Sequence, residues 1–329
     1  MEISCAFATS METPDWIAEA ERLGYRRAWC YDSPALYPDV WMILALAAER
    51  TTEIGLGPAV LVPSLRDPMV NAAAIASLAE LAPGRVAAAI GAGFTGRMVL
   101  GRRPMKWAEV AAYVRVLRAL LRGETADWEG STVAMLHPSG YGAARPVDVP
   151  ILIGADGPKG MAVAAELGDG VFSARRPQRA DNAPAWRALL QFGTVLDEGE
   201  DPGSPRVAAA AGQGLATAYH AIYERKGAAA VDRLPGGRTW RHVTEAIPRQ
   251  TRHMAIHEGH LIEMNERDRA AWDEARALVS TYTLTGTPAQ LRERLAELEA
   301  AGMTEIAYQP AGPDIGRELR AFAKVAGLS

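Results

Sequence analysis

The sequence predicts an α/β protein, a (β/α)8 barrel (TIM barrel) formed by a single domain over residues 1–329. Short apolar runs alternate with stretches of helical spacing along most of the chain, and this order is typical of parallel strands joined by helices. The runs are almost continuously apolar, as expected of strands that are buried on both faces. About eight such units in a chain of this length favour a closed barrel over the alternative, an open doubly wound sheet.

The expected elements follow from these runs in chain order. Strands are expected at 3–8, 27–31, 54–62, 85–90, 149–153, 170–173, 207–211 and 305–309. Helices are expected at 14–23, 40–50, 68–81, 105–122, 159–167, 184–196 and 315–325. Two stretches interrupt the alternation. Residues 126–145 indicate a small hairpin and loop, and 212–285 form a long insertion between strands 7 and 8. A long βα loop emerges at the active-site face of a barrel, so we expect this insertion to cover the barrel mouth.

The composition of the chain argues against several classes of protein. The chain has 35 basic and 39 acidic residues, a net charge of −4, and this mild acidity argues against a general nucleic-acid binder. No apolar run reaches the roughly 18 residues of a membrane span, and the amino terminus lacks the pattern of a signal peptide. Two cysteines are too few for a disulfide framework and favour a reducing compartment. We therefore expect a cytoplasmic protein with no nucleic-acid or membrane partner. A small-molecule substrate and a homodimer are further expectations that do not follow from composition.

A glycine motif follows the fourth expected strand. Residues 91–96 read GAGFTG and match the G-x-G-x-x-G pattern of dinucleotide-binding proteins. That pattern should open into a helix, whereas Gly101 and Pro104 would break an early helix here, and the motif does not follow the first strand. We interpret Gly91 and Gly93 as a strand end where the backbone approaches a flat ligand, since glycine permits close contact.

A second motif, GADGPKG at 154–160, lies between the strand 149–153 and the helix 159–167. Asp156 or Gly157 can be the N-cap, and Pro158 suits the first helical position. The free N–H groups of such a helix end attract anions, and Lys159 adds a full charge. The motif indicates either a site for a cofactor phosphate or ordinary helix capping.

Polar residues elsewhere provide candidates for chemistry. Asp32 follows the second expected strand, where a barrel places catalytic groups; the alternative is that it caps the helix after Pro38. His253, His257 and His260 have the spacing of one helix face and indicate either a lid that faces substrate or cofactor, or structural packing. HEGH does not have the H-E-x-x-H spacing of zinc hydrolases, so no metal site is predicted.

Several segments together resemble a known family: GYRRAWCYDS at 24–33, the long stretch 54–93, the segment 149–172, and 284–310. They are similar to the bacterial luciferase-like superfamily, most of all to the branch that uses coenzyme F420. That branch includes methylenetetrahydromethanopterin reductase and F420-dependent glucose-6-phosphate dehydrogenase. The resemblance covers most of the chain outside 126–145 and 212–285.

The resemblance implies a (β/α)8 barrel with a flat flavin or deazaflavin at its carboxyl-terminal mouth. It implies that the Ala59–Val60 peptide is cis and supports the back of the ring, and that the loop 156–158 contacts the cofactor phosphate. Two positions depart from the pattern: Ser33 replaces a frequent catalytic histidine, and Phe94 replaces the glutamate of the glucose-6-phosphate branch. These departures argue against a sugar-phosphate substrate.

We therefore expect an F420-dependent oxidoreductase that transfers a hydride between the deazaflavin and a C=N, C=C or carbonyl group of a small organic substrate. The alternatives are an FMN-dependent monooxygenase that uses O₂ and a non-catalytic flavin-binding barrel. The expected cofactor-binding residues are Asp32, Ala59, Val60, Gly91, Gly93, Asp156, Gly157, Pro158, Lys159, Arg175 and Arg176. The expected substrate-binding residues are Ser33, Phe94, Arg97 and His253. The expected catalytic residues are Asp32, His257 and His260. For Arg175 and Arg176, the alternative to cofactor binding is that both are solvated surface residues.

Overall fold

The computed structural model describes residues 1–175 and 184–328. The chain divides into two compact units. Unit 1 comprises Met1–Gly96, Arg103–Leu190 and Ala301–Ala307, and unit 2 comprises Arg97–Arg102, Gln191–Ala300 and Tyr308–Ser329. Arg176 was an expected cofactor-binding residue and lies outside the described residues.

Unit 1 is built on an eight-stranded sheet in the order β3-β2-β1-β10-β9-β8-β7-β4. The strands are β1 (Glu2–Phe7), β2 (Arg27–Cys30), β3 (Gly55–Pro58), β4 (Ala88–Gly91), β7 (Ile151–Gly154), β8 (Gly170–Ser173), β9 (Trp186–Phe192) and β10 (Glu305–Gln309). Parallel bridges from Leu56 to Val86 and from Leu61 to Ile90 bring the two outer strands together. The strands thus form a nearly closed parallel barrel, and the predicted fold class is confirmed.

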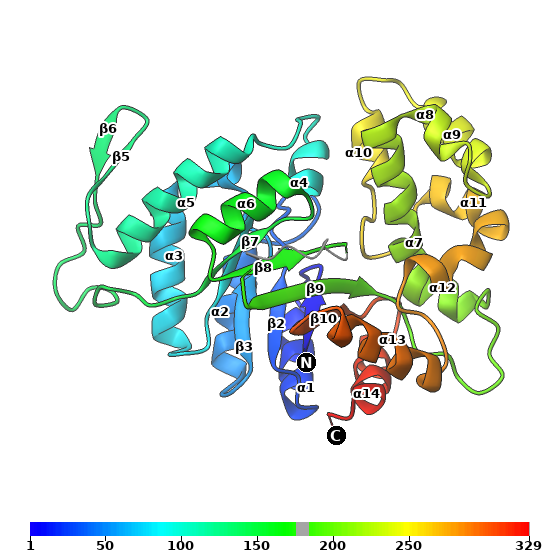
Figure 1. The fold of residues 1–329 in the computed structure, drawn as a ribbon, viewed down its shortest axis with the longest axis horizontal. Helices are drawn as coiled ribbons and strands as arrows, with labels where there is room; N and C mark the ends of the chain where they lie inside the picture. The colour runs from blue at the N-terminus through cyan, green and yellow to red at the C-terminus, as the bar shows by residue number, and fades with distance from the viewer. Residues whose placement is uncertain (176–183, 329) are drawn as a thin grey trace. The chain divides into compact units, whose positions relative to one another are not determined.

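The longer helices of unit 1 pack against one another in chain order: α1 against α2, α2 against α3, α3 against α5, and α5 against α6 (Figure 1). They are α1 (Thr13–Arg22), α2 (Val40–Arg50), α3 (Pro68–Leu81), α4 (Phe94–Met98), α5 (Trp107–Arg122) and α6 (Pro158–Leu167), with a short 3-10 turn at Pro63–Leu65. Asp39 caps α2 by accepting the N–H groups of Trp41 and Met42, and Asp67 caps α3 in the same way. The predicted helices 40–50 and 68–81 are confirmed with both boundaries.

The predicted hairpin within 126–145 is confirmed as β5 (Ala126–Trp128) paired antiparallel with β6 (Ser131–Val133). Two other predictions were wrong. The expected helix 184–196 contains strand β9, and the expected strand 207–211 lies in helix α7 (Pro205–Lys226). The apolar run there is rich in alanine, a strong helix former, and Ser204 accepts the N–H of Val207 as the N-cap.

Unit 2 is largely helical and holds all of residues 212–285. After α7 come α8 (Ala228–Val231), α9 (Gly237–Glu245), α10 (Arg252–Ile256), α11 (Glu266–Ala275), α12 (Val279–Tyr282), α13 (Pro288–Ala300) and α14 (Ile315–Ala326), with a 3-10 turn at Arg276–Leu278. Its core gathers around Leu215, Tyr219 and Trp240. Among the described residues, no helix combines the length and apolar composition that crossing a bilayer requires.

Candidate active site

The carboxyl ends of the strands in unit 1 bring most of the predicted cofactor residues to one edge of the barrel. Asp32 follows β2, Ala59 follows β3, Gly91 ends β4, and Asp156 and Arg175 follow β7 and β8. Because these strands run parallel, all five residues lie at the edge where barrel enzymes carry their active sites. This edge is the candidate active site.

Asp32 is buried at this edge and is held by an arginine. The Nη1 atom of Arg66 lies 2.5 Å from each carboxylate oxygen of Asp32, and its Nη2 atom donates to Asp39 at 2.6 Å. Burial raises the pKa of Asp32, against the hydrogen bonds and charge of Arg66. The alternative role of Asp32 as a helix cap is wrong, because Asp39 caps α2. Sequence reasoning missed Arg66, which lies far from Asp32 along the chain.

The Ala59–Val60 peptide is cis, as the resemblance implied. Val60 lies over the ends of two neighbouring strands, where Gly91 and Gly154 face each other in register. A Cβ on Gly154 would come 2.5 Å from Val60 Cγ1, and one on Gly91 would come 2.9 Å from Val60 Cγ2. The methyl groups of Val60 therefore leave no room for a side chain at Gly91 or Gly154. This contact explains Gly91, the first glycine of the 91–96 motif, and the sequence alone did not reveal it.

The motif 91–96 leads directly into a short helix. Residues 94–98 form α4, which is only five residues long and ends before Gly101, whose φ is 69°, in line with the expectation that Gly101 and Pro104 would break an early helix. Gly93 has φ 77°, the left-handed conformation that glycine adopts readily. A Cβ on Gly96 would lie 3.4 Å from both the Asp32 carbonyl oxygen and the Ser33 hydroxyl oxygen. The start of α4 therefore packs closely against the loop after β2.

Phe94 and Arg97 both belong to α4, and both are half-buried. Ser33 is also half-buried and lies beside α4 through the close approach of Gly96. Ser33 and Phe94 therefore share the candidate edge with Asp32.

Helix α6 begins at the same edge with an uncapped end. Gly157 is its N-cap, and no side chain caps it within the part of the chain that the structure describes. Pro158 has no N–H, and helix geometry leaves the N–H groups of Lys159 and Gly160 without an intrahelical acceptor. Apart from Gly157 itself and its two neighbours in the chain, no described residue comes within 4 Å of the place where a Cβ on Gly157 would be, and Lys159 is exposed. The end of α6 is thus open and positively polarised.

Asp156, the other candidate N-cap, has a different role. One of its carboxylate oxygens accepts the N–H groups of Ala174 at 3.0 Å and Arg175 at 3.1 Å. The Nε atom of Arg175 also approaches the second oxygen at 3.4 Å. Asp156 therefore fastens the loop after β7 to the loop after β8 and orients the exposed Arg175.

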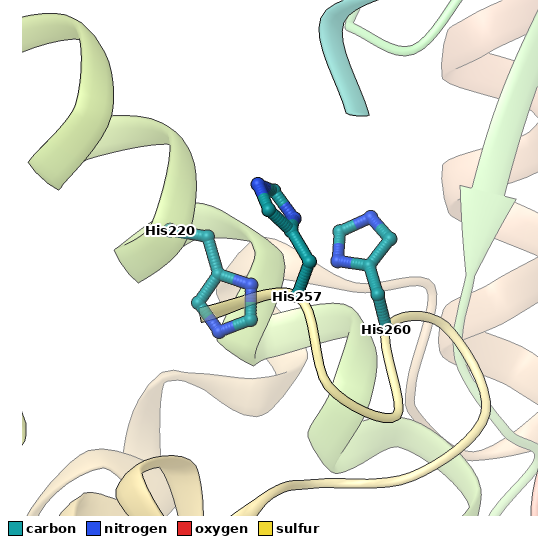
Figure 2. Close-up of side chains that lie close together, drawn as sticks. All are labelled: His220, His257 and His260. Carbon is teal, nitrogen blue, oxygen red and sulfur yellow. The ribbon is translucent and has the colours of Figure 1, made fainter. Parts of the chain in front are cut away.

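The predicted histidine face is arranged differently from the expectation. Helix α10 ends at Ile256, so His257 and His260 lie in the following turn. The prediction that the three histidines share one helix face was therefore wrong. These two rings are buried and meet a third, His220 of α7 (Figure 2). His253 is half-buried and packs near Gly101 instead. Sequence reasoning missed His220, since nothing in its helix singles it out.

Comparisons with known proteins agree with this architecture. The family model described as luciferase-like monooxygenase matches residues 8–305. The 5,10-methylenetetrahydromethanopterin reductase of Archaeoglobus fulgidus is 27% identical, and the alignment covers 94% of this chain and 92% of that protein. The F420-dependent glucose-6-phosphate dehydrogenase of Mycobacterium avium is 35% identical over 40% of each chain.

A solved structure shows the same fold over the full length. The coenzyme F420-dependent tetrahydromethanopterin reductase of Methanopyrus kandleri superposes with a TM-score of 0.65 at 19% identity, and the match covers 100% of both chains. The family match spans far more than half of the chain, and the barrel edge carries the grouped polar and glycine residues described above. The protein is an enzyme of the luciferase-like type, and the chain belongs to the luciferase-like monooxygenase family.

Proposed function

We propose that this protein is an F420-dependent oxidoreductase that transfers a hydride between the deazaflavin and a C=N, C=C or carbonyl group of a small organic substrate. The observation that carries the proposal is the open, uncapped end of α6 with Lys159 beside it. It occurs in a chain that is similar over 94% of its length to a methylenetetrahydromethanopterin reductase. The similarity to an F420-dependent dehydrogenase, 35% over part of the chain, supports the same cofactor.

The phosphate of the cofactor is proposed to bind at the start of α6. The N–H groups of Lys159 and Gly160 and the positive end of the helix would face the phosphate. The Lys159 ammonium would add a charged hydrogen bond. Arg175, oriented by Asp156, offers a second cation for an acidic cofactor. This donor set fits a phosphorylated cofactor because it presents free N–H groups and cations, with open space at Gly157.

The ring of the cofactor is proposed to lie at the ends of β3 and β4, against Ala59 and Val60 with Gly91 and Gly93 beside it. When bound, F420 supplies hydride chemistry that does not require oxygen. Val60 presents an apolar surface there, which would exclude water from one face of the ring. Asp32 is proposed as a catalytic carboxyl at the ring edge; Arg66 holds it in one orientation.

Ser33 and Phe94 are proposed to contact the substrate, because Ser33 directly follows Asp32 and lies close to α4, the helix that begins at Phe94. Neither side chain carries a charge, which suits an uncharged acceptor group better than a phosphate. The catalytic roles of His257 and His260, and the substrate-binding roles of Arg97 and His253, stay predictions.

An FMN-dependent monooxygenase is the second candidate, and the description of the matching family favours it. FMN also carries a phosphate, so the end of α6 would serve either cofactor. The two candidates differ in what the reduced protein does in air: a flavin monooxygenase consumes O₂, whereas deazaflavin hydride transfer does not.

The position of the phosphate can be tested with one substitution. Lys159→Ala should weaken F420 binding by about 1–3 kcal/mol, or roughly 5- to 150-fold in the dissociation constant. Equilibrium titration followed by the fluorescence of F420 measures this change. The matched control is Lys324→Ala, which removes an exposed lysine from α14 and should leave binding unchanged. Equal affinity of wild type and Lys159→Ala would contradict the proposal that the phosphate binds at the start of α6.

A further inference from the structure

Three histidines meet inside unit 2, and the cofactor site proposed above is argued without them. His220 comes from α7, and His257 and His260 come from the turn after α10; Figure 2 shows the three rings grouped together. The three residues are 2%, 0% and 7% exposed. One ring nitrogen from each lies within 4.8 Å of the others. Three buried imidazoles this close are a candidate set of metal ligands.

Two carboxylates orient the rings from outside the cluster. His220 Nε2 lies 2.9 Å from Asp268 Oδ1, and His257 Nε2 lies 2.9 Å from Glu224 Oε1. The Trp240 indole N–H also donates to Asp268 at 2.8 Å, which fixes that carboxylate in place. A neutral imidazole that donates from Nε2 to a carboxylate keeps a lone pair on Nδ1. Such carboxylate–histidine pairs are typical of the surroundings of protein-bound zinc.

A second observation that points to a ligand concerns the Nδ1 atoms of His220 and His257. Both atoms are fully buried, and neither has a hydrogen-bond partner among the described residues. A buried polar atom without a partner costs roughly 1–3 kcal/mol, and a native core seldom leaves two of them in one cluster. A bound cation would satisfy both atoms at once.

We propose that His220, His257 and His260 bind one divalent transition-metal ion, with Zn²⁺ as the expected metal. Imidazole nitrogen is a preferred ligand of zinc, and three histidines leave the fourth tetrahedral position for a water molecule. At zinc–nitrogen distances of about 2.0–2.1 Å the ligand nitrogens are about 3.3 Å apart, so the rings draw together slightly on binding. Asp268 and Glu224 place two negative charges just outside the ligands and balance the charge of the ion.

The proposed ion has a structural role within unit 2. It links helix α7 to the turn 257–260, and through the hydrogen bond of His220 to Asp268 it reaches α11 as well. These elements enclose the core around Trp240. A ligand that binds only the folded state stabilises that state, so zinc should raise the unfolding temperature of the protein. The inference does not depend on F420 binding.

The test uses the full-length chain without an affinity tag, stripped of metal by a chelator. Zn²⁺ is titrated in competition with a chromogenic chelator, and Co²⁺ is added separately because its visible absorption reports tetrahedral nitrogen ligands. We expect one Zn²⁺ per chain, a tetrahedral Co²⁺ spectrum, and a higher unfolding temperature with zinc. Absence of zinc binding by the wild-type chain at micromolar concentration would overturn the proposal.

Substitutions locate the site. His260→Asn and His220→Asn should each weaken zinc binding at least 100-fold and abolish the zinc-dependent rise in unfolding temperature. His253→Asn, which changes a half-buried histidine outside the cluster, is the control and should bind zinc as the wild type does. Far-UV circular dichroism of the metal-free variants checks that they are folded. Equal zinc affinity in the cluster variants and the control would overturn the assignment. If a cluster variant does not fold, the Co²⁺ spectrum of the wild-type chain decides, and an octahedral spectrum contradicts the proposal.

Discussion

Replacing Arg66 by methionine should destabilise the protein through the carboxylate it leaves behind. Asp32 is 3% exposed, and both of its oxygens lie 2.5 Å from Arg66 Nη1. Arg66→Met keeps an unbranched apolar stem but removes the guanidinium. Removal of one partner from a buried ion pair costs about 3–5 kcal/mol, because the remaining charge is left uncompensated. We expect a loss of this size in the free energy of unfolding at pH 7.

The loss should depend on pH in a defined direction. Burial raises the pKa of Asp32, so the folded protein binds this proton more tightly than the unfolded chain, in which an aspartate has a pKa of about 3.9. Stability from this group is therefore present below pH 4 and is lost as the pH rises through the pKa of the folded state. Without Arg66 the pKa of Asp32 rises further. The cost of the substitution should be smallest near pH 4 and should grow toward pH 7.

Urea unfolding at several pH values, followed by circular dichroism, measures both effects. The control is Arg50→Met, the same substitution in an exposed pair. Arg50 Nη1 lies 2.7 Å from Asp15 Oδ1, and the two side chains are 42% and 70% exposed. This pair should contribute less than about 1 kcal/mol. A cost for Arg66→Met as small as that of the control, or one that shrinks toward pH 7, would refute the reasoning.

Two further predictions concern other paired carboxylates. Glu305 accepts the indole N–H groups of Trp29 at 2.8 Å and Trp186 at 2.6 Å, so Glu305→Leu should lower the free energy of unfolding by about 2–4 kcal/mol, as judged from urea unfolding. A leucine variant as stable as the wild type would contradict this. The hydrogen bond from Arg206 lowers the pKa of Glu200 to about 2. The stabilisation from this pair is therefore complete above about pH 5, beyond the unfolded-state pKa of a glutamate, and disappears as the pH falls toward 2. Thermal unfolding of Glu200→Gln and wild type should differ at pH 7 and converge near pH 2, and a difference independent of pH would count against it.

The sequence predicted most of the fold because local signals and burial agreed. Asp39 and Asp67 cap helices whose apolar pattern was already evident, and both helices have the expected boundaries. The predictions for 184–196 and 207–211, around the seventh strand, were wrong because the local composition there suits helix and strand equally well. The stretch 186–192 carries a run of three buried residues that also fits a helix, and its pairing with the neighbouring strand settles the conformation.

The candidate site was predictable where it depended on chain order. Strand ends in a parallel barrel lie at one edge, so Asp32, Asp156 and Lys159 could be placed from the sequence. Partners from distant segments could not be placed. Arg66 follows a different strand from Asp32, and His220 joins the other two histidines only through the packing of α7 against the turn 257–260. Single-sequence patterns carry no information about such contacts.

The relative affinity of the protein for F420 and FMN tests the central claim most directly. Equilibrium titrations of the full-length protein with each cofactor, under anaerobic conditions, give the two dissociation constants. The proposed function predicts that F420 binds at least tenfold more tightly, a difference of about 1.4 kcal/mol. Binding of FMN as tight as or tighter than that of F420, or binding of neither cofactor, would contradict it.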